Sequence, residues 1–174
     1  YRYVAALKAN HLVEETDEGP GYRLGPKILE LAASMSRRPL RDVAKPYLAR
    51  IGRETGETVI LHGLRDQVGV CLEKVDGNQT LRVSYDQGDA YPLHASATGK
   101  AIFSHLDSKE RSKIIKNIGL ESFTPTTITQ SDVLEKACKE IRDNGFAESH
   151  GELIEGTRGI AAPIFSFSGR VVAS

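Results

Sequence analysis

The sequence carries no net charge, because 23 lysine and arginine residues balance 23 aspartate and glutamate residues. The total charge gives no reason to expect a nucleic-acid partner, but it does not exclude one, since the local distribution of charge decides such binding. No run of about 18 apolar residues occurs, which argues against a transmembrane helix, and no secretory signal is visible. We therefore expect a cytoplasmic chain with no membrane partner.

Cysteine is also scarce, since only Cys71 and Cys138 are present and they form no C-x-x-C pair. Two distant cysteines are typical of a reduced compartment, where they serve as small core residues. No histidine pair has H-E-x-x-H spacing and none has a cysteine neighbour, so we expect no metal site and no cofactor. The five histidines are His11, His62, His94, His105 and His150.

The length of 174 residues, 40% of them hydrophobic, is enough for one domain of ordinary size plus an appendage. Both ends look cut. Residues 1–8 have helix character but no cap before them, and residues 170–174 have the pattern of a strand that stops in mid-run. We therefore expect the chain to be a fragment of a longer protein.

The N-terminal segment predicts part of a DNA-binding domain. Residues 1–10 have a helical pattern, and the short apolar runs 12–15 and 22–24 flank a Gly/Pro-rich turn that predicts a hairpin. A helix tail followed by a short hairpin is typical of the second half of a winged helix-turn-helix. We assign residues 1–24 to the end of such a domain.

Two helices are predicted next. Gly25-Pro26 begins the first, because proline costs nothing at the first helical turn, and residues 25–38 form the predicted linker helix. A second helix begins at Pro39 and ends at Gly56, and Pro46 inside it should kink or break it.

Residues 39–174 predict an α+β domain, an antiparallel sheet with helices packed on it, because strands are followed by helices and then by strands with hairpin connections. The predicted helices begin at the caps Ser96, Asp107 and Ser131. The predicted strands cover residues 58–64, 68–75, 80–85, 146–150, 159–167 and 170–174. The glutamates around His150, at positions 148, 152 and 155, have the pattern of a solvated turn.

The stretch His94–Ala101 is the most informative part of the chain. Its small residues leave backbone N–H groups uncovered at a helix start, where the helix dipole also favours an anion. The stretch does not match the spacing of a phosphate-binding P-loop. It does not match the S-x-x-K motif of a serine acyl-enzyme either, because Gly99 stands three residues after Ser96, where that motif has lysine. The alternative that Ser96 is only a structural cap stays open, and the two roles are compatible.

Six short motifs follow one another along the chain: Tyr22–Gly25, Thr55–Thr58, Pro92–His94, Thr98–Lys100, Gly145–Ala147 and Arg158–Pro163. This ordered set resembles the IclR family of bacterial transcriptional regulators over the whole chain. This resemblance implies a winged helix-turn-helix on a double-stranded DNA operator and a C-terminal GAF-like effector domain. It also implies dimers or dimers of dimers, in which a small organic or aromatic acid alters operator binding.

The resemblance further implies which residues bind the effector. A carboxylate meets backbone amides at Ala97 and Thr98, within the helix start that runs from Ser96 to Gly99. Ser149 falls where some members have a carboxylate, and its neutral hydroxyl does not repel an acid. Gly159 falls where some members carry a bulkier side chain. Glycine there should leave more room in the pocket, for a larger ligand or simply as a different shape of the pocket floor.

The residues implied in DNA binding are Tyr1, Arg2, Tyr3 and Arg23. Arg2 matches a family arginine near the end of the recognition helix, and Arg23 lies on the wing, where Tyr22 and Leu24 should pack. Residues 1–30 hold four basic and five acidic side chains, which is not a basic footprint. We expect this chain alone to bind DNA weakly or not at all.

Three functions remain in competition. A ligand-responsive regulator acting as a homodimer fits all the patterns above. An enzyme using His94 or Cys71 lacks a catalytic constellation, so we predict that the chain is not an enzyme. A dimerisation or interaction module without a ligand stays open because Ser149 replaces an acidic residue.

Overall fold

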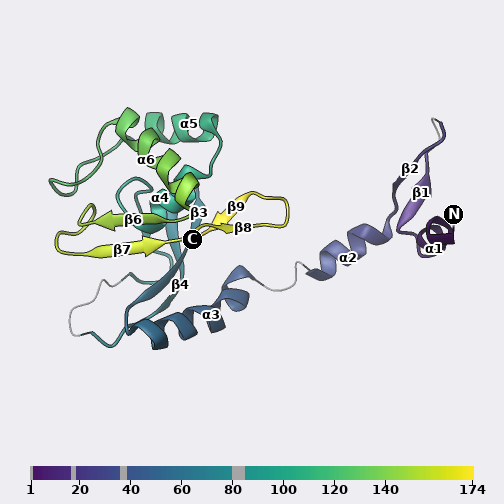
Figure 1. The fold of residues 1–174 in the computed structure, drawn as a ribbon, viewed down its shortest axis with the longest axis horizontal. Coiled ribbons are helices and arrows are strands. Elements are labelled where there is room, and N and C mark those ends of the chain that lie inside the picture. Colours follow the sequence, from purple (N-terminus) through teal and green to yellow (C-terminus); the bar gives the residue numbers. More distant parts are fainter. Residues whose placement is uncertain (1, 17–18, 36–38, 80–84) are drawn as a thin grey trace. The chain divides into compact units, whose positions relative to one another are not determined.

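A computed structural model describes residues 2–16, 19–35, 39–79 and 85–174. The chain divides into two compact units, Tyr1–Val43 and Ala44–Ser174 (Figure 1). Parts of three predictions fall outside the described residues: most of the strand at 80–85, the end of the linker helix at 36–38, and Tyr1 of the DNA-binding set.

The first unit has the predicted helix and hairpin. Helix α1 spans Arg2–Ala9, and strands β1 (Val13–Glu15) and β2 (Tyr22–Leu24) pair antiparallel. Gly25 allows the end of the hairpin to pass close to the residues that follow α1, because a Cβ there would lie 2.2 Å from the carbonyl oxygen of His11. Helix α2 (Lys27–Met35) follows, where a linker helix is predicted.

Helix α3 runs without a break from Leu40 to Thr55, through Pro46. The expectation that Pro46 breaks it is therefore wrong. Ala44 and Leu48, on either side of the proline, are both buried, and tertiary packing of this face outweighs the loss of one helical hydrogen bond. The helix ends as predicted at Gly56, whose φ is 74°.

A five-stranded antiparallel sheet forms the centre of the second unit, in the order β5-β4-β3-β9-β8. Strands β3 (Val59–Arg65) and β4 (Val68–Val75) make a hairpin, and β5 (Ala90–Tyr91) pairs with β4. The β3–β4 register slips by one residue, because Leu61 pairs with Glu73 and His62 with Cys71. The predicted α+β class with an antiparallel sheet is confirmed.

The three predicted helices of this unit are α4 (Ala97–Ser104), α5 (Ser108–Ile118) and α6 (Ser131–Asn144). Ser96 caps α4, and Asp107 forms a capping box with Glu110 at the start of α5, as the spacing predicts. The cap assigned to Ser131 is wrong, because Gln130 holds the N-cap position without a side-chain hydrogen bond and Ser131 is the first helical residue.

The predicted strand 159–167 is two strands in two different sheets. Strand β7 (Arg158–Ala161) pairs with β6 (Ala147–His150), whereas β8 (Ile164–Phe165) pairs with β9 (Val171–Ala173) in the large sheet. Pro163 lies between them. It has no N–H to donate to a ladder and it restricts the preceding residue, so pairing ends there.

Helix α4 lies at the centre of the core and contacts α6, β3, β6, β7 and β9. Its Phe103 joins α5 and α6, and its Ala101 joins Ile141 of α6 and Ala147 of β6. Both cysteines are free and buried, as expected. The main cluster contains Leu93, Phe103, Leu106, Ile114, Leu134 and Cys138. Contacts on several sides therefore fix the position of α4.

Candidate functional site

The first turn of α4 has the geometry of an open helix start. Ser96 is extended, with φ −141° and ψ 155°, and its Oγ accepts a hydrogen bond of 3.0 Å from the Gly99 N–H. The first N–H groups of any helix lack an intrahelical partner, and the cap satisfies one of them. The remaining donors, at Ala97 and Thr98, and the helix dipole suit a carboxylate.

The structure brings Gly159 of β7 directly against this turn. A Cβ on Gly159 would lie 3.3 Å from the Cβ of Ala97, so β7 passes close to the helix start. Ser149 of β6 is buried and pairs with Gly159 in the β6–β7 ribbon. The helix start and this part of the β6–β7 ribbon therefore lie close together in the structure.

Gly99 allows the preceding loop to approach the helix. A Cβ at this position would lie 2.6 Å from the carbonyl oxygen of Leu93 and 2.8 Å from its carbonyl carbon. Backbone cannot yield as a side-chain end can, so only glycine allows the loop through Leu93 to run this close to α4. Gly99 thus fixes the position of the proposed anion-binding turn.

Replacing Gly99 by alanine is expected to lower the free energy of unfolding by about 1–3 kcal/mol, because the backbone collision outweighs the higher helix propensity of alanine. Chemical denaturation measures the loss. Gly159→Ala adds the same methyl group against only the side chain of Ala97, and it should cost less. Equal losses, or a gain in Gly99→Ala, would contradict the close approach of Leu93.

A buried polar cluster that the sequence analysis missed lies beside the same turn. His62 Nδ1 of β3 lies 2.6 Å from Thr98 Oγ1, and the centroids of the His62 and Tyr91 rings are 3.9 Å apart. Ser174 Oγ donates to the Thr98 carbonyl oxygen at 3.0 Å. Burial lowers the pKa of His62 to about 4 and raises the pKa of Tyr91, so both side chains are neutral at pH 7.

One turn further along α4, Lys100 forms a buried ion pair. Its Nζ lies 2.5 Å from Glu152 Oε1, and the two side chains are 5% and 10% exposed. The Glu152 carbonyl oxygen accepts hydrogen bonds from the hydroxyls of Thr124 (3.3 Å) and Thr127 (2.6 Å). The interpretation of Glu152 as part of a solvated turn is therefore wrong, since tertiary pairing with α4 draws it into the core.

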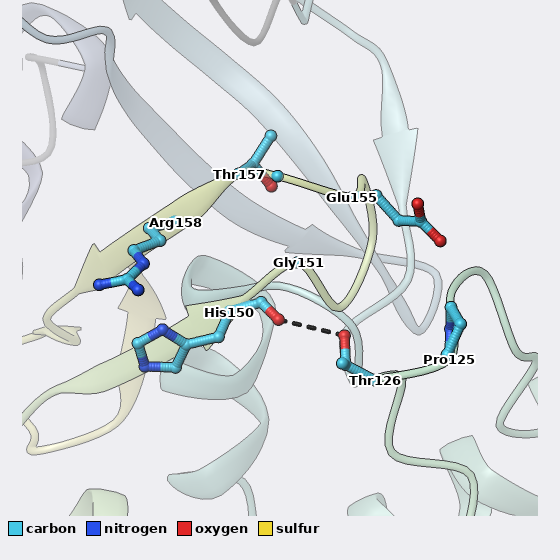
Figure 2. Close-up of a pocket in the computed structure, with 8 residues that line it drawn as sticks. Pro125, Thr126, His150, Gly151, Glu155, Thr157 and Arg158 are labelled. Atoms are coloured by element: carbon cyan, nitrogen blue, oxygen red, sulfur yellow. Dashed lines mark hydrogen bonds between the residues drawn. The ribbon is translucent and has the colours of Figure 1, made fainter.

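A hollow of about 460 Å³ opens where the β6–β7 loop meets Thr126 (Figure 2). His150 and Arg158 line it, and the Thr126 hydroxyl donates to the His150 carbonyl oxygen at 3.1 Å. Neighbouring residues of a strand face opposite sides, and His150 is exposed whereas Ser149 is buried. The hollow therefore lies on the outer face of the ribbon, away from the face that meets α4.

The residues considered for catalysis have structural surroundings. His94 is buried, and its Nε2 lies 2.9 Å from the Glu121 carbonyl oxygen. Burial raises the pKa of the Cys71 thiol, the opposite of what a nucleophile needs. Within the described residues, no three His, Cys, Asp or Glu side chains are grouped to hold a metal ion, and no helix is long and apolar enough to cross a membrane.

The DNA-binding candidates lie on the first unit. Arg2 and Tyr3 are exposed on α1, as a contact role requires. Arg23 Nε lies 3.3 Å from Glu14 Oε2 across the hairpin, which offsets the charge of the wing. Tyr22 and Leu24 are 53% and 73% exposed, so the expectation that they pack is wrong for the described chain. Both flank Arg23 on an exposed strand.

Comparison with known proteins finds transcriptional regulators among both related sequences and solved structures. The HTH-type transcriptional regulator BhcR of Paracoccus denitrificans is 30% identical over 174 residues, which are 99% of this chain and 62% of that protein. The chain therefore spans less than two thirds of this relative. A crystal structure of an IclR transcriptional regulator from Silicibacter sp. TM1040 matches with a TM-score of 0.86 and 25% identity, over 99% of this chain and 68% of the other.

A second crystal structure shows an IclR homologue from Microbacterium hydrocarbonoxydans in complex with 4-hydroxybenzoate. It matches with a TM-score of 0.71 and 26% identity, over 99% of this chain and 71% of the other. The family model described as "Bacterial transcriptional regulator IclR C-terminal" covers residues 32–174. Since that span is most of the chain, the chain belongs to the IclR family of bacterial transcriptional regulators, which are not enzymes.

Proposed function

We propose that this chain is part of a ligand-responsive, DNA-binding transcriptional regulator whose second unit binds a small organic or aromatic acid. The observation that carries the proposal is the first turn of α4, where Ser96 caps an open helix start that Gly159 approaches and Ser149 faces from the neighbouring strand. The complex of a structural relative with 4-hydroxybenzoate supports an aromatic acid as one ligand class.

In this proposal the three segments have separate roles. Residues 1–24 are the end of a winged helix-turn-helix that contacts a double-stranded DNA operator through Arg2, Tyr3 and Arg23. Residues 25–38 are the linker helix, and residues 39–174 are a GAF-like effector domain that acts as a homodimer or a dimer of dimers. The acid changes operator affinity only as far as it binds one of two conformations more tightly than the other.

The acid site is tested by adding one carboxylate to each face of β6. Ser149→Asp places a negative charge on the face toward α4 and should weaken binding of benzoate or acetate roughly tenfold or more, by like-charge repulsion. His150→Asp adds the same charge one residue further along, on the outer face, and should leave binding nearly unchanged. Isothermal titration calorimetry measures both affinities.

Equal losses of affinity in the two variants would indicate that the acid does not bind at the inner face of the ribbon. Binding of no small carboxylate would support an interaction module without a ligand. The regulatory step is tested separately, by measuring operator affinity of the full-length regulator with and without the saturating acid. An unchanged affinity would refute ligand control even if the acid binds.

A further inference from the structure

Two buried polar atoms beside the first turn of α4 have no hydrogen-bond partner within the described chain: His62 Nε2 and Tyr91 Oη. His62 is 2% exposed and Tyr91 is 4% exposed. Thr98 lies near enough to Tyr91 to act on its pKa, but its hydroxyl does not reach hydrogen-bond geometry with the phenol. Buried polar groups without partners are costly and therefore uncommon, so this pair needs a physical explanation.

Both side chains are held firmly in place. The Tyr91 ring lies on Gly69 of the neighbouring strand, where a Cβ would come within 2.1 Å of its Cζ. The His62 ring is fixed by the 2.6 Å contact of its Nδ1 with Thr98 Oγ1 and by its tilted stacking on Tyr91. The two free polar atoms therefore belong to a preorganised pair, a property of binding sites.

The chemistry of the pair selects its ligand. Both side chains are neutral at pH 7, so neither offsets the charge of a carboxylate. A hydroxyl group donates one hydrogen bond and accepts others, which satisfies a phenol and an imidazole nitrogen in either tautomer. A ligand with only C–H groups here leaves both atoms unpaired, and sites of this kind reject such analogues.

We infer that His62 and Tyr91 bind a hydroxyl group of the same acid whose carboxylate binds at the first turn of α4. The effector class is therefore a hydroxy acid, and the plain acid of the same skeleton is discriminated against. This inference rests on the proposed function, because it needs the carboxylate at Ala97 and Thr98. Thr98 joins the two halves, since its backbone belongs to the helix start and its hydroxyl contacts His62.

The test compares acids that differ by one hydroxyl group. Isothermal titration calorimetry on the full chain uses benzoate with 3- and 4-hydroxybenzoate, acetate with glycolate, and propanoate with lactate. At least one hydroxy acid should bind roughly tenfold or more tightly than its matched acid. Tyr91→Phe removes only the phenol oxygen and should reduce this preference severalfold without weakening the matched acid, because only the contact with His62 remains. Tyr47→Phe, at an exposed position on α3, should leave the preference unchanged.

The outcomes separate this inference from the proposed function. Equal affinities within every pair, or an undiminished preference in Tyr91→Phe, overturn the hydroxyl site but leave the acid site standing. Binding of no acid overturns both. If Tyr91→Phe does not fold, long-range ¹H–¹⁵N NMR of the wild-type chain decides. The His62 Nε2 resonance should shift with the hydroxy acid and not with the matched acid, and equal shifts would refute the contact.

Discussion

Replacing Lys100 by methionine is expected to lower the free energy of unfolding by about 3–5 kcal/mol, the cost of leaving a buried charge without its partner. The Glu152 carboxylate would then be uncompensated inside the core, where its Oε2 already has no hydrogen-bond partner among the described residues. Methionine keeps most of the lysine's length, so the loss reports the charge rather than a cavity. Urea denaturation monitored by circular dichroism measures it.

Two comparisons make the result specific. Arg50→Met breaks the exposed ion pair with Glu54 on α3 and should leave stability nearly unchanged, because water screens such pairs. Adding Glu152→Leu to Lys100→Met removes both charges and should restore much of the loss. A Lys100→Met protein as stable as Arg50→Met would show that Glu152 is solvated after all.

Acid is expected to destabilise the chain through His62, by about 3 kcal/mol between pH 6.5 and pH 4. Burial holds the pKa of His62 at about 4 in the folded chain, against 6.5 for the free side chain. Between these values the unfolded chain binds a proton that the folded chain does not, so protonation favours unfolding. The stabilising contribution is complete above pH 6.5 and is lost as the pH falls to 4.

The free energy of unfolding measured from pH 7.5 to pH 4 checks this dependence. Carboxylates titrate in the same range, so the informative quantity is the difference between the wild type and His62→Asn, which lacks the titrating ring. His150→Asn removes an exposed histidine and should follow the wild-type profile. A His62→Asn profile parallel to the wild type would mean that His62 titrates normally in the folded chain.

Local features of the fold could be predicted from the sequence because they depend on neighbouring residues. Ser96 and Asp107 cap their helices through backbone N–H groups only three residues away, so their spacing was informative. Ser131 shows the limit of this reasoning: a residue suited to capping stands one position too late, and Gln130 takes the cap position without a side-chain bond.

The sequence-based predictions are wrong where packing between residues far apart in the sequence decides the local structure. Lys100 and Glu152 are 52 residues apart, and no local pattern distinguishes a glutamate in a buried pair from one in a solvated turn. The local rule against proline inside a helix predicts a break at Pro46, yet the buried face of α3 overrides that rule. The division at Pro163 is different, because a proline within an apolar run is itself a readable sign that pairing ends.

The polar half of the proposed site could not be predicted, because it depends on strand register. His62 lies in an apolar run and looks like any core histidine in the sequence. Only the pairing of β3 with β4, the short strand β5 that places Tyr91, and the position of α4 bring it to Thr98. The anion-binding half, by contrast, follows from consecutive residues, and the resemblance to a family indicated it directly.

The register slip between β3 and β4 also determines which kinds of evolutionary change matter here. Leu72 has no partner on β3, so β4 is one residue longer than the segment it pairs with. Side chains alternate along a strand, but the bulge absorbs the extra residue, because Cys71 and Glu73 still lie opposite the neighbouring residues His62 and Leu61. A deletion of Leu72 would therefore restore a regular ladder without turning the following residues of β4 to the opposite face. Homologous regulators that lack one residue at this position should keep the same β4 side chains on each face of the sheet and differ only in the local bend of the strand.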